Sequence, residues 1–203
     1  MMKPRTLLCI LFCAVALTTA CSEDNTQRKP GRTRIESNPM MEVKDQTVRE
    51  PKNADAWFHL ADLYEQAGMY PQEAEALLKV IEIDPSRGYS YAKLGTTYNR
   101  LDRYDDAIVQ FRKAAKLLPK NPVVFNNMAY AYGKTGKVDE QVAALRRAIA
   151  IRPSYATARF NLAIVYLHSN NKAGALQQYE ALKKIDETAA ESLKREIDET
   201  RKN

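Results

Sequence analysis

Residues 88–121 read GYSYAKLGTTYNRLDRYDDAIVQFRKAAKLLPKN, and the same pattern recurs along the chain. When the copies are aligned, Trp57, Tyr91, Phe125 and Arg159 stand 34 residues apart. Self-similarity at one fixed spacing is typical of proteins built from stacked structural repeats. The period therefore predicts one design that is copied four times from residue 54 onward.

The first half of each copy carries one apolar helical face. A large apolar residue, a small residue and a tyrosine stand three, four and seven positions beyond the first aromatic, a spacing that falls on one side of a helix. They are Leu60, Ala61 and Tyr64, Leu94, Gly95 and Tyr98, Met128, Ala129 and Tyr132, and Leu162, Ala163 and Tyr166. The small residues let two helices approach closely, and the tyrosines fill the groove beside them. We expect core residues here, not a cofactor site.

Each copy then breaks and continues with a second apolar stripe. The breaks fall at Gly68, at Leu101 and Asp102, at Gly136, and at Asn170 and Asn171. The second stripe of one copy contains Ala107, Ile108, Phe111 and Ala114. Pro85, Pro119 and Pro153 close the first three copies, because proline cannot continue a helix. Each copy therefore predicts a helix, a turn, a second helix and an exit.

The second copy resembles the tetratricopeptide repeat, a 34-residue helix-turn-helix unit. The family's characteristic residues are present at Tyr91, Leu94, Gly95, Tyr98, Ala107, Phe111, Ala114 and Pro119. The other copies depart from this pattern in places. Glu73 and Gln141 replace the alanine, Arg159 replaces the first aromatic residue, Asn170 replaces the glycine of the turn, and Glu187 replaces the closing proline. The resemblance implies an all-α solenoid of four repeats, residues 54–87, 88–121, 122–155 and 156–187. Such repeats stack into a superhelix because none can bury its apolar face alone.

The C-terminal segment, residues 188–203, does not continue the repeats. Thr188 and Glu191 match a capping box, which predicts the start of a helix. That helix carries Leu193 and Ile197 on one side and charged residues elsewhere. We predict a capping helix that covers the last apolar face of the array, with a partner-binding or dimerising helix as the alternative.

The N-terminus has the pattern of a secretory signal peptide, residues 1–20. Lys3 and Arg5 precede an apolar run at residues 7–17, which is shorter than the roughly 20 residues that a membrane span needs. The sequence then reads TTAC at residues 18–21 and resembles the lipobox of bacterial lipoproteins. This resemblance implies a lipid on Cys21, and Ser22 after it implies the outer membrane, facing the periplasm. The alternative is a cleaved, soluble protein.

Residues 21–53 are predicted to form a flexible linker, because their polar composition cannot bury enough surface to fold, apart from a short turn at residues 40–48. Its basic residues are either solvated or in contact with anionic headgroups. They are Arg28, Lys29, Arg32 and Arg34. Cys9 and Cys13 leave with the signal peptide, so the mature chain keeps only Cys21 and forms no internal disulfide.

Charge and composition bound the function. The net charge of +6 is mild and scattered, which does not indicate a nucleic-acid partner. The only two histidines, His59 and His168, lie at opposite ends of the array, and the sequence has neither a cysteine pair nor a phosphate-binding glycine loop. No catalytic residue, metal site or cofactor is therefore predicted, and the expected partner is a protein or peptide.

The resemblance implies where that partner binds, because in this family the first helices line a concave groove. The side chains expected there combine apolar groups with amides and charges. They are Phe58, Asp62, Tyr89, Lys93, Thr96, Asn126, Asn127, Tyr130, Lys134, Phe160, Asn161 and Ile164. A side-chain amide can both donate to and accept from a peptide backbone. The alternative for the asparagines is a solvated or helix-stabilising role.

Together these features predict a lipid-anchored adaptor that binds a protein or peptide in the cell envelope. The chain resembles repeat lipoproteins that support the assembly of envelope machines such as the type IV pilus. One alternative is a soluble periplasmic scaffold or chaperone, and another is an accessory subunit that regulates a cell-wall enzyme. The sequence leaves the partner's identity and the oligomeric state open.

Overall fold

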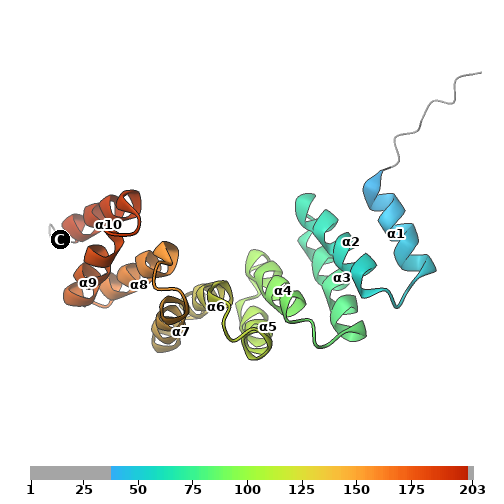
Figure 1. Cartoon of the computed structure of the whole chain (residues 1–203), viewed down its shortest axis with the longest axis horizontal. Coiled ribbons are helices and arrows are strands. Elements are labelled where there is room, and N and C mark those ends of the chain that lie inside the picture. Colours follow the sequence, from blue (N-terminus) through green and yellow to red (C-terminus); the bar gives the residue numbers. More distant parts are fainter. Residues whose placement is uncertain (1–37, 201–203) are drawn as a thin grey trace, which may run out of the picture. The chain divides into compact units, whose positions relative to one another are not determined.

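The computed structural model describes residues 38–200, which form ten α-helices and no strand (Figure 1). The predicted all-α fold is confirmed. The helices are α1 (Pro39–Arg49), α2 (Ala54–Gln66), α3 (Tyr70–Ile83), α4 (Gly88–Arg100), α5 (Tyr104–Leu117), α6 (Pro122–Lys134), α7 (Val138–Ile151), α8 (Ala156–His168), α9 (Lys172–Leu182) and α10 (Glu187–Glu199). The predicted signal peptide and Cys21 lie outside the described residues. Within residues 38–200, no helix is long and apolar enough to span a bilayer.

Helices α2, α4, α6 and α8 begin at residues 54, 88, 122 and 156, the four predicted openings of the repeats. Each packs against the second helix of its own repeat, and that second helix packs against the first helix of the next repeat (Figure 1). Contacts are thus made mainly between neighbours along the chain, as expected for repeats that cannot bury their apolar faces alone.

The turn inside each repeat needs a left-handed residue. The backbone φ angle is +70° at Gly68 and +72° at Gly136, and it is 57° at Asp102 and 55° at Asn170. Aspartate and asparagine tolerate this conformation better than other side chains. The N–H that follows each left-handed residue donates to the carbonyl of the recurring tyrosine of that repeat at 2.7–2.9 Å, which ends the first helix.

The recurring tyrosines belong to the core, as the sequence predicted. Tyr64, Tyr98, Tyr132 and Tyr166 keep only 5–8% of their surface exposed. The recurring small residue beside each of them is fully buried or nearly so, for instance Ala61 at 0%. The periodic residues therefore build the fold and leave little of their own surface for a ligand.

Helix α1 corrects the predicted linker at its C-terminal end. The side chain of Asn38 accepts a hydrogen bond from the N–H of Met40 at 3.0 Å, and Pro39 occupies the first turn, so the helix has a defined start. Val43 and Thr47, one turn apart, are buried where α1 packs against α2. The sequence prediction, which rested on the polar composition of this segment, missed the stripe of Val43 and Thr47 that packs on the first repeat.

Helix α10 packs against α8 and α9 and buries Ala190, Leu193 and Ile197. The predicted capping box is wrong in its register. Asp186, and not Thr188, caps the helix, since its carboxylate accepts a hydrogen bond from the N–H of Ala189 at 3.0 Å. The aspartate caps the helix two residues before the threonine that the sequence pattern suggested.

The packing of Gly95 against Phe111 gives a test of the repeat design. A Cβ added at Gly95 would lie 2.8 Å from the ring of Phe111, which is fully buried. Overpacking costs about 1–3 kcal/mol and the gain in helix propensity returns about 1 kcal/mol, which leaves a net loss of about 0–2 kcal/mol. We expect Gly95→Ala to lower the free energy of unfolding by about 1 kcal/mol.

The third repeat suggests a second substitution that should compensate for Gly95→Ala, because it has Ala129 and Leu145 at the positions of Gly95 and Phe111. Combining Gly95→Ala with Phe111→Leu should recover part of the loss. Denaturant unfolding of both single variants and the double variant measures this coupling. Strictly additive losses would show that the two positions do not constrain each other.

Candidate functional site

The first helices of the repeats form the inner-helix face, defined here as the surface that α2, α4, α6 and α8 contribute. Two hollows lie on this face. Ten of the twelve predicted groove residues line one or the other, and Asp62 and Phe160 line neither. The structure therefore divides the predicted continuous groove into two separate depressions.

The Tyr130 hollow lies between the third and fourth repeats and has a volume of about 420 Å³. The predicted residues in it are Asn126, Tyr130, Lys134, Asn161 and Ile164. The Tyr130 ring is 49% exposed, its edge meets Tyr104 at 6.2 Å between ring centroids, and the Lys134 ammonium lies 5.5 Å from its centre. An exposed ring that its neighbours hold in place is suited to pack against an apolar side chain of a partner.

Gly133 and Gln141 are among the residues of this hollow that sequence reasoning missed. Gln141 stands where the family prefers alanine, and its side chain lies over Gly133, where a Cβ would be only 2.5 Å from its Nε2 atom. The missing Cβ makes room for the longer side chain. The departure from alanine was visible in the sequence, but its compensation by a glycine eight residues earlier appears only in the packing.

The Tyr89 hollow lies between the first three repeats and has a volume of about 370 Å³. The predicted residues in it are Phe58, Tyr89, Lys93, Thr96 and Asn127. Val123, which the prediction missed, also lines it and is 41% exposed. Val123 stands one period after Tyr89, so the repeat itself carried the signal that could have found it.

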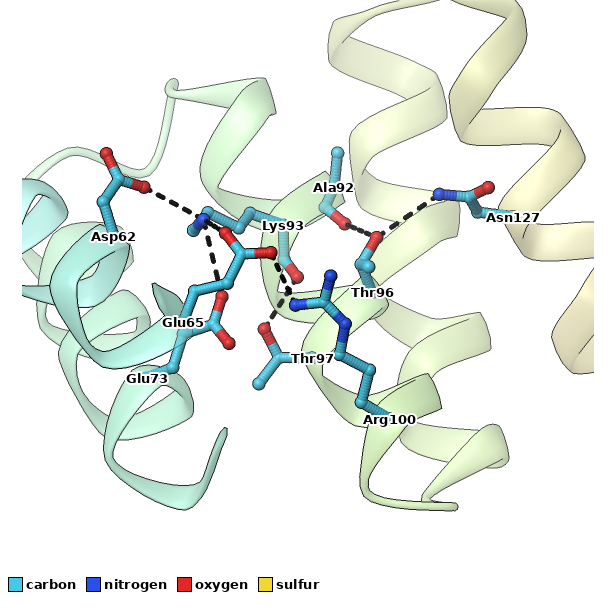
Figure 2. Close-up of polar contacts among 9 residues, drawn as sticks. All are labelled: Asp62, Glu65, Glu73, Ala92, Lys93, Thr96, Thr97, Arg100 and Asn127. Carbon is cyan, nitrogen blue, oxygen red and sulfur yellow. Dashed lines mark hydrogen bonds and ion pairs between the residues drawn. The ribbon is translucent and has the colours of Figure 1, made fainter. Parts of the chain in front are cut away.

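A chain of side-chain hydrogen bonds joins the two hollows. Asn161 donates to Asn126 at 3.1 Å, Asn126 donates to Asn127 at 3.2 Å, and Asn127 donates to the hydroxyl of Thr96 at 3.4 Å (Figure 2 shows the last bond). Thr96 in turn donates to the carbonyl of Ala92. Each amide has two N–H donors and an oxygen with two lone pairs, so these bonds orient the asparagines and leave capacity for a ligand.

Lys93 is not available to clamp an anion, because three carboxylates surround it (Figure 2). Its ammonium lies 2.9 Å from Asp62 and 3.5 Å from Glu73, and it also pairs with Glu65. Arg100 bonds the other oxygen of Glu65 at 2.5 Å. Hydrogen bonding to Lys93 lowers the pKa of Glu65. The predicted side chains Asp62 and Lys93 therefore neutralise each other.

Glu73 is the unusual member of this ion cluster. Glu73 replaces the alanine that the family prefers at this position, and it is fully buried. Neither of its carboxylate oxygens has a hydrogen-bond partner among the described residues. The Thr97 hydroxyl nearby donates to the carbonyl of Lys93 instead. Burial raises the pKa of the Glu73 carboxyl, and the charge of Lys93 opposes that rise. A buried carboxylate that accepts no hydrogen bond is costly even with an ammonium 3.5 Å away, so Glu73 destabilises the fold at this position.

No group of three or more histidine, cysteine or acidic side chains within residues 38–200 is arranged to hold a metal ion. The polar groups of the two hollows are amides, hydroxyls, the neutralised Lys93, and Lys134 and His168 in the Tyr130 hollow. Such groups suit hydrogen bonding to a peptide backbone, with the exposed apolar residues beside them supplying contact area.

The buried carboxyl predicts a specific pH dependence of stability. A carboxyl with a higher pKa in the folded protein than in the unfolded one destabilises the fold when it ionises. The free energy of unfolding therefore falls as the pH rises from the ordinary value of 4.5 through the raised folded value. Glu73→Gln should remove this pH-dependent decrease. The free energy of unfolding of the variant minus that of wild type should therefore be larger at about pH 7 than at about pH 4.

Denaturant unfolding at both pH values measures the effect. Glu75→Gln is the matched control, because Glu75 is exposed on the same helix α3. An equal difference between Glu73→Gln and wild type at the two pH values would contradict the prediction.

Comparison with solved structures places this geometry among known repeat proteins. The crystal structure of MamA superposes with a TM-score of 0.71 and 20% identity, covering 75% of this chain and 89% of that chain. PilW, described as a widely conserved type IV pilus biogenesis factor, gives 0.69 and 21%, covering 80% and 77%. YrrB, described as a TPR protein with an unusual peptide-binding site, gives 0.62 and 20%, covering 71% and 74%. At these identities the likeness shows a shared fold.

Sequence comparison identifies the family. No curated protein matches the sequence. Residues 43–88 and 126–190 match a family model described as tetratricopeptide repeat, and residues 95–136 match a second model described as TPR repeat. The first model alone covers more than half of the 203 residues, so this chain is a protein-interaction module that belongs to the tetratricopeptide repeat family.

Proposed function

We propose that this protein is a lipid-anchored adaptor that binds an extended segment of a partner protein in the bacterial cell envelope. The observation that carries the binding site is the row of amides between the two hollows. Asn126 lines the Tyr130 hollow, and its chain neighbour Asn127 lines the Tyr89 hollow. One extended segment can therefore place side chains in both hollows while its backbone meets the amides between them.

The chemistry of the hollows favours a mainly apolar stretch of the partner. Tyr89, Val123 and Tyr130 are exposed by 62%, 41% and 49%. Lys93, the cation of the Tyr89 hollow, is already neutralised by its three carboxylates. Apolar contacts would supply most of the affinity, and the asparagines would fix the orientation of the segment. YrrB, described as having an unusual peptide-binding site, is an example of a protein of this fold that binds a peptide.

The envelope location rests on the N-terminal sequence. A basic start, a short apolar run and the TTAC motif at residues 18–21 support export and lipidation of Cys21. Several acyl chains are enough for durable anchoring. The fold that the chain shares with PilW, a described pilus biogenesis factor, is consistent with a role in assembling an envelope complex.

Metabolic labelling with a fatty acid tests the anchor. Wild-type protein produced in a diderm bacterium should incorporate label and fractionate with membranes, whereas Cys21→Ser should do neither, because the lipid is attached to the cysteine sulfur. Equal labelling of the two proteins would refute lipidation and leave the binding proposal untouched.

Site-specific photo-crosslinking in cells tests the binding face. A photoreactive phenylalanine analogue at position 130 should crosslink to one discrete partner, and the same analogue at Val109 on α5 should not. Val109 is the matched control because both side chains are 49% exposed. Adding Asn161→Ala should weaken the crosslink from position 130, since Asn161 both lines that hollow and orients Asn126. Equal crosslinking from positions 109 and 130 would move the binding surface away from the inner-helix face.

A further inference from the structure

The described chain is strongly segregated in charge. Residues 107–179 contain 11 lysines and arginines against only two acids, Asp139 and Glu140. Residues 38–106 contain 13 acids against eight bases. The net charge of the whole chain conceals this separation, because the two regions cancel in part. The basic region includes α7 and residues 107–117 of α5, the second helices of the third and second repeats, and the first turn of α5 carries Asp105 and Asp106.

Four cations on these two helices form a repeated set, which we name the cation row: Arg112, Lys113, Arg146 and Arg147. All four are exposed. The first pair and the second pair are one period apart, and α5 and α7 both pack against α6. The row therefore belongs to two neighbouring repeats and does not recur in the first or the fourth, where Leu78 and Lys79, and Glu180 and Ala181, occupy the positions.

Aromatic residues of the first helices hold the cations in equivalent places in both repeats. Arg112 donates from Nε to the hydroxyl of Tyr132 at 3.2 Å, and Arg146 donates to the hydroxyl of Tyr166 at 3.1 Å from Nε and 2.7 Å from Nη2. The ammonium of Lys113 lies 5.5 Å from the centre of the Tyr91 ring. The guanidinium of Arg147 lies 5.9 Å from the centre of the Phe125 ring. These contacts orient the cations without neutralising them.

None of the four cations has a carboxylate partner within the part of the chain that the structure describes. The acids of α5 and α7 lie in the first turn of each helix, at Asp105, Asp106, Asp139 and Glu140. Interaction with the helix dipole falls off within the last turn, so it does not account for Arg112, which lies five residues before the end of α5. Like charges held together without a counter-charge repel each other.

We propose that the cation row binds the headgroups of an anionic lipid bilayer. Of its four members only Arg146 borders a hollow, and the row lies on the second helices, away from the two hollows of the inner-helix face. A partner protein needs pockets for its anchoring side chains, whereas a lipid surface presents many phosphates to an exposed set of cations. Val109 and Leu117 on α5 are 49% and 43% exposed and lie beside the row, where they can contact the interfacial region.

This inference goes beyond the proposed function, because it holds whether or not Cys21 carries a lipid and whatever segment the hollows bind. The inner-helix face would remain open to the partner while the second helices of the middle repeats contact the membrane. A tether alone would leave the orientation of the repeats undetermined, and the cation row would supply it.

Vesicle sedimentation with the full chain carrying Cys21→Ser tests the proposal without a lipid anchor. The vesicles are phosphatidylcholine alone, or phosphatidylcholine and phosphatidylglycerol at about two to one. The difference in partitioning between them isolates the effect of lipid charge from any apolar contact of the N-terminal segment. We expect the parent chain to partition at least about tenfold more strongly to the anionic vesicles at low ionic strength, and this preference to shrink with added salt.

Two variants with the same loss of charge separate the cation row from the basic linker. The first changes Arg112, Lys113, Arg146 and Arg147 to glutamine, and the second changes Arg28, Lys29, Arg32 and Arg34 to glutamine. The first should lose most of the preference for anionic vesicles, and the second should keep most of it. Arg112 and Arg146 contact buried tyrosines, so the first variant can fail to fold. A third variant with only Lys113→Gln and Arg147→Gln keeps those contacts, and it should lose part of the preference for anionic vesicles.

Three results would overturn the proposal. They are equal partitioning of the parent chain to both vesicles, a loss in the linker variant as large as in the cation-row variant, and cation-row-dependent binding to soluble polyglutamate without binding to anionic vesicles. The last result would identify an acidic protein as the ligand of the row. Circular dichroism of every variant confirms that differences in binding do not follow from unfolding.

Discussion

The close approach of the two helices within each repeat is the constraint on which the rest of the structure depends. A small residue on the first helix admits a large side chain of the second, as Gly95 admits the ring of Phe111. A left-handed turn residue and a hydrogen bond to the recurring tyrosine fix the helix end that makes this pairing possible. Each pair still has an uncovered apolar face, so neighbouring repeats, α1 and α10 must pack on it.

The departures from the repeat pattern are informative because the pattern itself is so regular. Glu73 and Gln141 both replace the packing alanine, and the structure accommodates them in different ways. Gln141 lies over a glycine, whereas Glu73 is buried 3.5 Å from the ammonium of Lys93, which also pairs with Asp62 and Glu65. A side chain that costs stability in the core thus joins two surface carboxylates in neutralising a cation of the Tyr89 hollow.

The two faces of the repeats have different chemistry. The inner-helix face presents amides and exposed aromatic rings, with Lys93 neutralised and Lys134 beside the Tyr130 ring, which suits a peptide segment. The second helices of the middle repeats present oriented cations without counter-charges, which suits an anionic surface. Both faces are built from residues that vary between repeats, and the recurring residues stay buried in the core that separates them.

The sequence by itself determined the all-α fold, the phase of the four repeats, the core tyrosines and ten of the residues that line the two hollows. Helical periodicity and the repeat, which reinforce each other four times, predicted the fold, and the resemblance to the tetratricopeptide repeat predicted the groove residues. Only the tertiary structure decided that α1 packs on the first repeat, that Asp186 caps α10, that the groove is divided into two hollows, and that Lys93 is neutralised. Apart from the Asp186 cap, which is a local choice between two nearby capping residues, these features depend on contacts between residues far apart in the chain, such as Lys93 with Glu65 and Asn161 with Asn126. Pairings at such distances leave no local pattern in a single sequence.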